Sequence, residues 1–265
     1  MKIFVSADIE GTTGIAMWDE TENGHPRYAY FQKQMTREVT AACEGAMDAG
    51  VTEFLIKDAH DSACNLIPDM LPEEALLLRG WARDPKAMMA GLDESFGGVF
   101  FTGYHSGAGM DTSPLSHTMN GQNNYIRING LPCSELLMNS YTAAYYGVPV
   151  RLVTGDKGLC ESIRAINPNI ETVAVNEGFG NATLSIHPNK AIRLIREAAK
   201  RAAEKDAKDC MIALPDHFNV EICFKDHQKA KSASHYPGMV QTGAKTVVFE
   251  ADDYMDVLKM FHWVL

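Results

Sequence analysis

The chain alternates short apolar runs with longer stretches in which apolar residues recur every three or four positions. Residues 2–7 (KIFVSA) and 52–57 (TEFLIK) are apolar runs typical of buried strands. Between them, residues 28–47 follow the period of an amphipathic helix, and Gly50 is placed to end it. A strand, a helix and a strand in this order predict a parallel pair joined by a right-handed crossover.

Similar patterns continue to the end of the chain. Asn129-Gly130 predicts a hairpin, because this dipeptide favours the tight turn between two antiparallel strands. Further strands are expected at residues 74–80, 97–103, 148–156, 171–175, 219–224 and 245–251, and further helices at 135–147, at about 189–208 and over the last residues.

These elements predict an α/β protein. We expect an N-terminal, mainly parallel sheet with flanking helices, and a smaller C-terminal α/β domain. Asn167-Pro168 is a turn signal, and we place the boundary there. The first domain then comprises residues 1–167 and the second residues 168–265.

Composition narrows the class of protein. The 265 residues are 46% hydrophobic and 22% charged, as in ordinary globular proteins. A net charge of −10 argues against nucleic-acid binding, which requires a basic face. No apolar stretch approaches the length of a membrane span, and the first residues lack the pattern of a signal peptide. Six scattered cysteines favour reduced thiols, so we expect a cytoplasmic protein with no membrane partner.

Five side chains that can bind a metal stand where apolar runs stop and polar loops begin. Asp8 and Glu10 follow the first predicted strand, and His60 follows the second. His105 follows the strand predicted at residues 97–103, and Glu135 follows the predicted hairpin. In an open α/β sheet, active sites are built at the carboxyl ends of the strands. Three carboxylates and two imidazoles are close to what a two-zinc hydrolytic site needs.

The residues alone leave this interpretation open. Asp and Glu in a loop after a strand are more often turn formers or helix caps than metal ligands. The D-x-E and D-x-H patterns are short enough to occur by chance. Asp58 lies two residues before His60, on the same side of an extended chain, and is a candidate to orient that imidazole.

Several segments together carry a family resemblance. SADIEGTTG, KDAH, GYHSG, LSHTMN, SELLMNSYTAAYYGVPV and VTGD follow one another in an order and spacing that resemble the D-aminopeptidase family of binuclear zinc peptidases, peptidase family M55. The resemblance extends to PGMVQTGAKTVVFEA near the end. It implies that Asp8 bridges two zinc ions, that Glu10 and His60 bind one of them, and that His105 and Glu135 bind the other.

The same resemblance implies a catalytic residue and an activity. His117 in the SHTM segment matches the family's proposed catalytic histidine. The implied reaction is hydrolysis of short peptides with an N-terminal D-residue such as D-Ala, by a water activated by two metals. Catalysis and metal binding then belong to residues 1–167, and we expect residues 168–265 to serve oligomerisation. Family members form ring-like homo-oligomers, so a decameric ring is expected.

Two alternatives remain beside this interpretation. The same ligands would serve another two-metal hydrolase, either an amidohydrolase or a phosphoesterase. A phosphoesterase should carry Arg or Lys near the site, and the first half of the chain offers little beyond Lys57 and Arg127. The other alternative is a non-catalytic binding protein that a metal stabilises.

Overall fold

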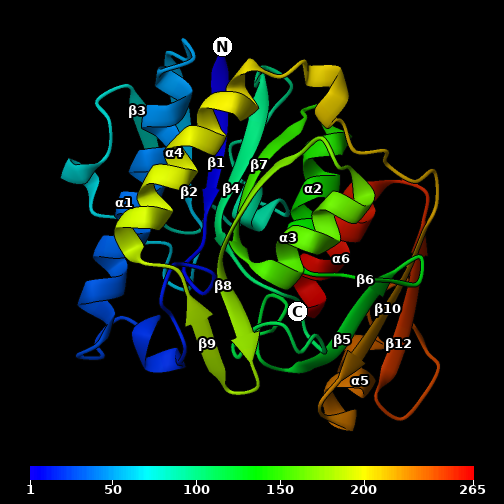
Figure 1. The fold of residues 1–265 in the computed structure, drawn as a ribbon. Coiled ribbons are helices and arrows are strands. Elements are labelled where there is room, and N and C mark those ends of the chain that lie inside the picture. Colours follow the sequence, from blue (N-terminus) through cyan, green and yellow to red (C-terminus); the bar gives the residue numbers. More distant parts are fainter.

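A computed structural model describes residues 1–265, the whole chain, as two β-sheets with helices on both faces of the larger one (Figure 1). The helices are α1 (Tyr28–Met47), α2 (Glu135–Tyr145), α3 (Lys157–Ile166), α4 (Pro188–Glu204), α5 (His227–Ala233) and α6 (Tyr254–Val264). The strands are β1 (Lys2–Ala7), β2 (Glu53–Asp58), β3 (Ala75–Leu78), β4 (Gly98–Tyr104), β5 (Asn123–Ile128), β6 (Leu131–Pro132), β7 (Val150–Asp156), β8 (Glu171–Phe179), β9 (Ala182–Ser185), β10 (Phe218–Phe224), β11 (Val240–Gln241) and β12 (Thr246–Ala251). Short 3-10 turns are η1 (Trp18–Glu20), η2 (Pro68–Met70), η3 (Ala87–Met89) and η4 (Ala207–Cys210).

The larger sheet has the order β3-β2-β1-β4-β7-β8-β9 and is parallel except for β9, which pairs antiparallel with β8. The chain builds outward from β1 to β2 and β3 on one side, and then returns to add β4 and β7 on the other. The strand order therefore reverses between β1 and β4. In open α/β sheets the crevice at such a switch point is the usual place for a ligand.

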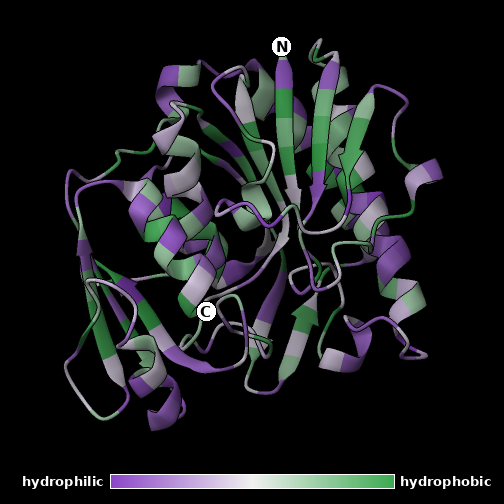
Figure 2. Cartoon of the chain, turned by 180° about the vertical axis from the view of Figure 1, so that it is seen from behind, coloured by the Kyte–Doolittle hydropathy of each residue, from purple (hydrophilic) through white to green (hydrophobic).

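Alternation along the strands assigns each side chain of the sheet to one of two cores. Ile3 and Val5 of β1 pack with α1 and α4 on one face, whereas Phe4 packs on the opposite face with residues of α2, α3 and α6. The strands of the larger sheet are largely hydrophobic in colour in Figure 2. The sheet is thus buried on both faces, as parallel sheets usually are.

The smaller sheet has the order β11-β12-β10-β5-β6 and is antiparallel. The predicted hairpin is confirmed: β5 and β6 pair through a turn in which Asn129 has φ 51° and Gly130 has φ 79°. Two positive φ values in succession are what a two-residue type I′ turn requires. Along β10 every second side chain is fully buried, and these side chains share one core with α2 and α6.

The expected α/β class is confirmed, and the helix at residues 28–47 matches α1 at both ends. The helix expected at about 189–208 ends at Glu204, and α3, α5, β9 and β11 are additional elements. The sheets do not divide at residue 167, because β8 and β9 complete the larger sheet while β5 and β6 begin the smaller one. The division into folding units of residues 1–167 and 168–265 stays a prediction. No helix is both long and apolar enough to cross a membrane.

Two glycines let the loop after β1 lie against the end of β4. The Gly11 amide donates to the Gly103 carbonyl at 2.8 Å. A Cβ on Gly11 would lie 1.8 Å from the Tyr104 carbonyl oxygen, and one on Gly103 would lie 2.2 Å from the Asp8 carbonyl oxygen. Gly103 also has φ 67°, which favours glycine. This backbone approach sets Asp8 and Glu10 against the segment that carries His105.

We predict that Gly11→Ala lowers the free energy of unfolding by about 3 kcal/mol, because the added methyl group meets backbone atoms that must move apart. Gly121→Ala is the matched control. A Cβ there meets nothing within 4 Å, so its effect should stay within about 0.5 kcal/mol. Urea unfolding followed by tryptophan fluorescence measures both. Equal stability of the two variants would show that the loops can separate freely.

Candidate metal centre

Four of the five predicted ligands lie at the carboxyl ends of parallel strands. Asp8 and Glu10 follow β1, His60 follows β2, and His105 directly follows β4. Glu135 is different: it is the first residue of α2, where Ser134 caps the helix by accepting the Leu137 amide. The expectation that every ligand follows an apolar strand is corrected for this residue. The β5–β6 hairpin of the smaller sheet directly precedes α2 and places the first residue of this helix at the site.

The side chains form two groups that share one carboxylate. Asp8 Oδ1 lies 3.4 Å and Glu10 Oε2 lies 3.1 Å from His60 Nδ1. Asp8 Oδ2 lies 3.4 Å and Glu135 Oε2 lies 3.5 Å from His105 Nε2. In each three-residue group the donor atoms lie within 4.8 Å of one another, and all five residues are buried. One oxygen of Asp8 therefore faces each group.

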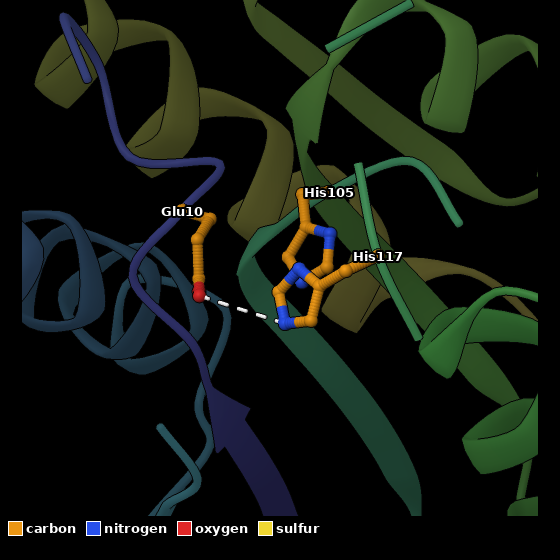
Figure 3. Close-up of side chains that lie close together, drawn as sticks. All are labelled: Glu10, His105 and His117. Carbon is orange, nitrogen blue, oxygen red and sulfur yellow. Dashed lines mark ion pairs between the residues drawn. The ribbon is translucent and has the colours of Figure 1, made fainter. Parts of the chain in front are cut away.

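His117 lies over the centre from the loop between β4 and β5. Its ring stacks on that of His105, with centroids 4.2 Å apart and planes 7° from parallel (Figure 3). Its Nε2 lies 3.8 Å from Glu10 Oε1, the pair joined by the dashed line in Figure 3, and 3.6 Å from Glu135 Oε1. His117 therefore reaches a carboxylate of each group. A third donor group combines it with Glu10 and His105.

Backbone carbonyls fix which nitrogen each imidazole turns toward the centre. The outer ring nitrogen of His60 lies 3.0 Å from the Thr21 carbonyl, that of His105 lies 3.0 Å from the Ser106 carbonyl, and that of His117 lies 2.9 Å from the Leu115 carbonyl. A carbonyl only accepts, so each outer nitrogen donates. In the neutral ring the inner nitrogen then carries the lone pair, which is the state a metal ligand needs.

Several buried polar atoms of the centre have no hydrogen-bond partner. Asp8 Oδ2, Glu10 Oε2 and His105 Nε2 are all inaccessible and unpaired. Buried polar atoms are seldom left without a partner, because their desolvation then goes uncompensated. These atoms point inward within the donor groups, so a bound cation would satisfy all of them. The residues present therefore fit a metal.

The carboxylates and imidazoles of the centre shift one another's pKa. Burial by itself would raise the pKa of Asp8, but the adjacent imidazoles of His105 and His60 hold that pKa well below its usual value. Burial would lower the pKa of both imidazoles, but the charge of Glu10 raises the pKa of His60 and that of Glu135 raises the pKa of His105. Without a cation these rings keep a proton on the inner nitrogen. A metal would replace that proton.

The role expected for Asp58 needs correction. Its carboxylate accepts from the Asn65 amide at 2.5 Å, the Asn65 side chain at 2.9 Å and the Leu66 amide at 2.7 Å, and it does not contact the His60 ring. Asn65 in turn donates to the His60 carbonyl at 2.6 Å. Asp58 thus closes the loop that carries His60, and the ring itself is oriented by Thr21. That carbonyl lies 39 positions away, beyond the reach of local spacing.

Asp156 is a supporting residue that the sequence interpretation did not select. This buried carboxylate at the end of β7 accepts from the Ser106 amide at 2.6 Å and the Ser106 hydroxyl at 2.6 Å. It also caps α3 by accepting the Leu159 amide at 2.9 Å. It therefore anchors the residue next to His105. In the sequence, Asp156 could have been selected as an Asp at the end of a predicted strand that directly precedes apolar residues at helical spacing.

A cavity of about 220 Å³ opens onto the centre. It is lined by Asp8, Glu10, Ala59, His60, Asp61, Trp81, Met88, His117, Met119 and Glu135. No Arg or Lys is among them. Lys57 is buried and donates to the Gly80 carbonyl, whereas Arg127 pairs with Glu221 on the smaller sheet. The two cations considered for phosphate binding therefore do not reach this cavity.

Comparisons with known proteins agree with this geometry. The model of the peptidase M55 family, described as D-aminopeptidase, matches residues 1–263. A curated D-aminopeptidase of Bacillus subtilis (strain 168) is 33% identical over 258 residues, which cover 97% of this chain and 93% of that protein. The solved structure of Zn-dependent D-aminopeptidase DppA from Bacillus subtilis, described as a self-compartmentalizing protease, superposes with a TM-score of 0.92 at 32% identity, covering 100% of this chain and 96% of that one.

We predict that Asp156→Ala lowers the free energy of unfolding by about 3–5 kcal/mol, because it leaves the buried Ser106 amide unpaired, removes one of the two partners of the Ser106 hydroxyl and removes a helix cap. Asp253→Ala is the matched control. Asp253 caps α6 from an exposed position by accepting the Met255 amide, so its loss should cost about 1 kcal/mol. Chemical unfolding of both variants gives the comparison. Similar losses would mean that Asp156 does no more than cap its helix.

Proposed function

This chain belongs to the peptidase M55 family of D-aminopeptidases, and we propose on that basis that it is a zinc-dependent aminopeptidase that removes an N-terminal D-residue such as D-alanine from short peptides. The observation that carries the proposal is the pair of buried donor groups that share Asp8. A shared carboxylate between two sets of ligands is the arrangement that two-metal hydrolases use. The preference for a D-residue rests on the family relation.

The proposed ligands follow the two donor groups. Glu10 and His60 would hold one zinc ion, His105 and Glu135 would hold the other, and Asp8 would be shared between them. Two observations support this assignment. Both donor groups contain Asp8, and His60 and His105 each turn a nitrogen that can carry a lone pair toward their group. Bound there, two zinc ions would lower the pKa of a water molecule and polarise the peptide carbonyl.

His117 is the residue that we assign to proton transfer. Its Nδ1 donates to the Leu115 carbonyl, so Nε2 faces the space above Glu10 and Glu135. From there it can pass a proton to the leaving amine, or stabilise the developing oxyanion when protonated. The edge of Trp18 packs against the ring, with centroids 5.1 Å apart, and restricts its orientation.

The absence of a cationic side chain in the cavity favours a peptidase over a phosphoesterase. Phosphoryl groups are normally met by Arg or Lys as well as by metals, and the lining of this cavity has neither. A non-catalytic, metal-stabilised protein would need neither His117 nor an open cavity beside the donor groups. Activity measurements distinguish the three possibilities.

We predict that His117→Ala lowers kcat for D-alanyl p-nitroanilide by at least about 100-fold, because it removes the group that transfers a proton in the transition state. The metals have their own ligands in this assignment, so the variant should keep two zinc ions per chain. Steady-state kinetics and metal analysis of the same preparation measure the two quantities.

His217→Ala is the control for that experiment. His217 is half exposed on the smaller sheet and pairs with Asp252, so its loss should change neither activity nor zinc content. Asp8→Ala should lose both metals, because each depends on that carboxylate. Wild-type protein that binds two zinc ions but hydrolyses only phosphoesters would refute the peptidase. Metal-bound protein without any activity would favour the binding protein.

An oligomer is the second part of the proposal. The relative of known structure is described as self-compartmentalizing, and a chamber requires several chains. We assign to this chain a homo-oligomer, a decameric ring. Large apolar side chains on the β8–β9 hairpin support assembly: Phe179 is 82% and Leu184 is 68% exposed in the single chain. The hairpin protrudes at the lower edge of the larger sheet in Figure 1. All six cysteines are free thiols, which supports a cytoplasmic location.

Light scattering after size-exclusion chromatography should give about 290 kDa, ten times the 29.2 kDa of one chain. We predict that the double variant Phe179→Lys, Leu184→Lys has a lower mass, because charges would be buried against a neighbouring copy. Tyr30→Lys on α1, where the side chain is 59% exposed, should keep the wild-type mass. A wild-type monomer would contradict the oligomer, and an unchanged double variant would exclude this hairpin from the interface.

A further inference from the structure

A second cavity adjoins the metal centre. Its volume is about 310 Å³, and it shares two wall residues, Trp81 and Met119, with the cavity over the donor groups. Its other walls include Met138 of α2 and Phe261 of α6, and they are mostly apolar. A molecule bound at the metals could therefore continue past Trp81 into this space.

The loop of residues 81–87, which forms one rim of the second cavity, is tied to the loop that carries His60. The Trp81 indole donates to the Asp61 carbonyl at 2.6 Å, and the Gly80 amide donates to the Ala63 carbonyl at 2.7 Å. The position of this rim is therefore coupled to the position of a predicted metal ligand.

Backbone strain is concentrated around the two cavities. Six residues other than glycine have positive φ, and four of them line one or both cavities: Asp61, Arg83, Ala87 and Met119. Non-glycine residues adopt this conformation at an energetic cost, and such residues cluster at binding and catalytic sites. Arg83, with φ 58°, is the charged member of this set on the rim of the second cavity.

Arg83 is also the cation of this rim without a partner. Lys86 donates to the Leu92 carbonyl at 3.0 Å and lies 3.5 Å from Asp84 Oδ2, so the charges of Lys86 and Asp84 compensate each other. Arg83 makes no hydrogen bond and no ion pair within the chain. Its guanidinium is free to bind an anion, and its planar geometry matches that of a carboxylate.

We infer that the second cavity is the subsite for the leaving part of the substrate, and that Arg83 binds the free C-terminal carboxylate of a short peptide. The inference rests on the proposed aminopeptidase function and specifies its substrate. In an aminopeptidase the free amino end of the substrate lies at the metals, so its carboxyl end points away from them. The space beyond Trp81 carries the unpaired Arg83 on its rim, and that cation suits the carboxyl end.

In a dipeptide the carboxylate lies a single residue, about 3.5 Å, beyond the bond that is cut. The side chain of that second residue would lie against the apolar wall formed by Met138 and Phe261. The chain should thus prefer short peptides with a free carboxylate and an apolar residue after the bond that is cut.

The test compares D-alanyl-D-alanine with its C-terminal amide, which has the same peptide bond but no negative charge. Wild-type protein should have a higher kcat/KM for the free acid. Arg83→Gln should lower the ratio of acid to amide roughly tenfold or more, mainly through KM, because a charge-assisted hydrogen bond is lost. Arg83→Lys should restore part of the ratio.

Arg79→Gln is the matched control. Arg79 is exposed four residues earlier and lines neither cavity, so its variant should keep the wild-type ratio. Hydrolysis of D-alanyl p-nitroanilide, which has no carboxylate, reports separately on the proposed function. If wild-type protein cleaves that compound but treats acid and amide alike, the subsite is refuted while the peptidase stands. Equal losses for acid and amide in Arg83→Gln would also refute it.

Discussion

The carboxylate of Asp8 is the group on which the rest of the centre depends. It is buried, and its two oxygens face two different imidazoles at 3.4 Å each. Two further carboxylates, Glu10 and Glu135, are buried beside it. Such a concentration of negative charge inside a protein is unfavourable unless positive charge compensates it. Protonated imidazoles do so in the free chain, and bound cations would do so more completely.

The fold brings the ligands together at the carboxyl ends of β1 and β4, where segments far apart in the sequence meet. The reversal of strand order places the centre at the carboxyl ends of β1 and β4, and the hydrogen bond from the Gly11 amide to the Gly103 carbonyl holds these ends against each other. Asp156 then fixes Ser106, next to His105. The geometry of the centre is therefore maintained by backbone contacts and buried carboxylates outside the donor set itself. This is the support that a precise metal site needs.

The two adjoining cavities differ in charge. The cavity over the donor groups is acidic and has no Arg or Lys in its lining, whereas the second has the unpaired Arg83 on its rim. With the amino end of the substrate at the metals, as the proposed activity requires, Arg83 would hold the carboxyl end of a short peptide in the second cavity.

The local sequence pattern determined several elements of the fold and the positions of most candidate ligands. The helix over α1, the Asn129-Gly130 turn and the carboxyl-end positions of Asp8, Glu10, His60 and His105 follow from periodicity and residue type, because each depends on neighbours within a few positions. Only the tertiary structure decided that the start of α2 brings Glu135 beside His105, that Thr21 rather than Asp58 orients His60, and that β8 and β9 complete the first sheet. These contacts join residues far apart in the chain, where spacing carries no information. The cavity beyond Trp81 depends in the same way on α6, at the opposite end of the chain.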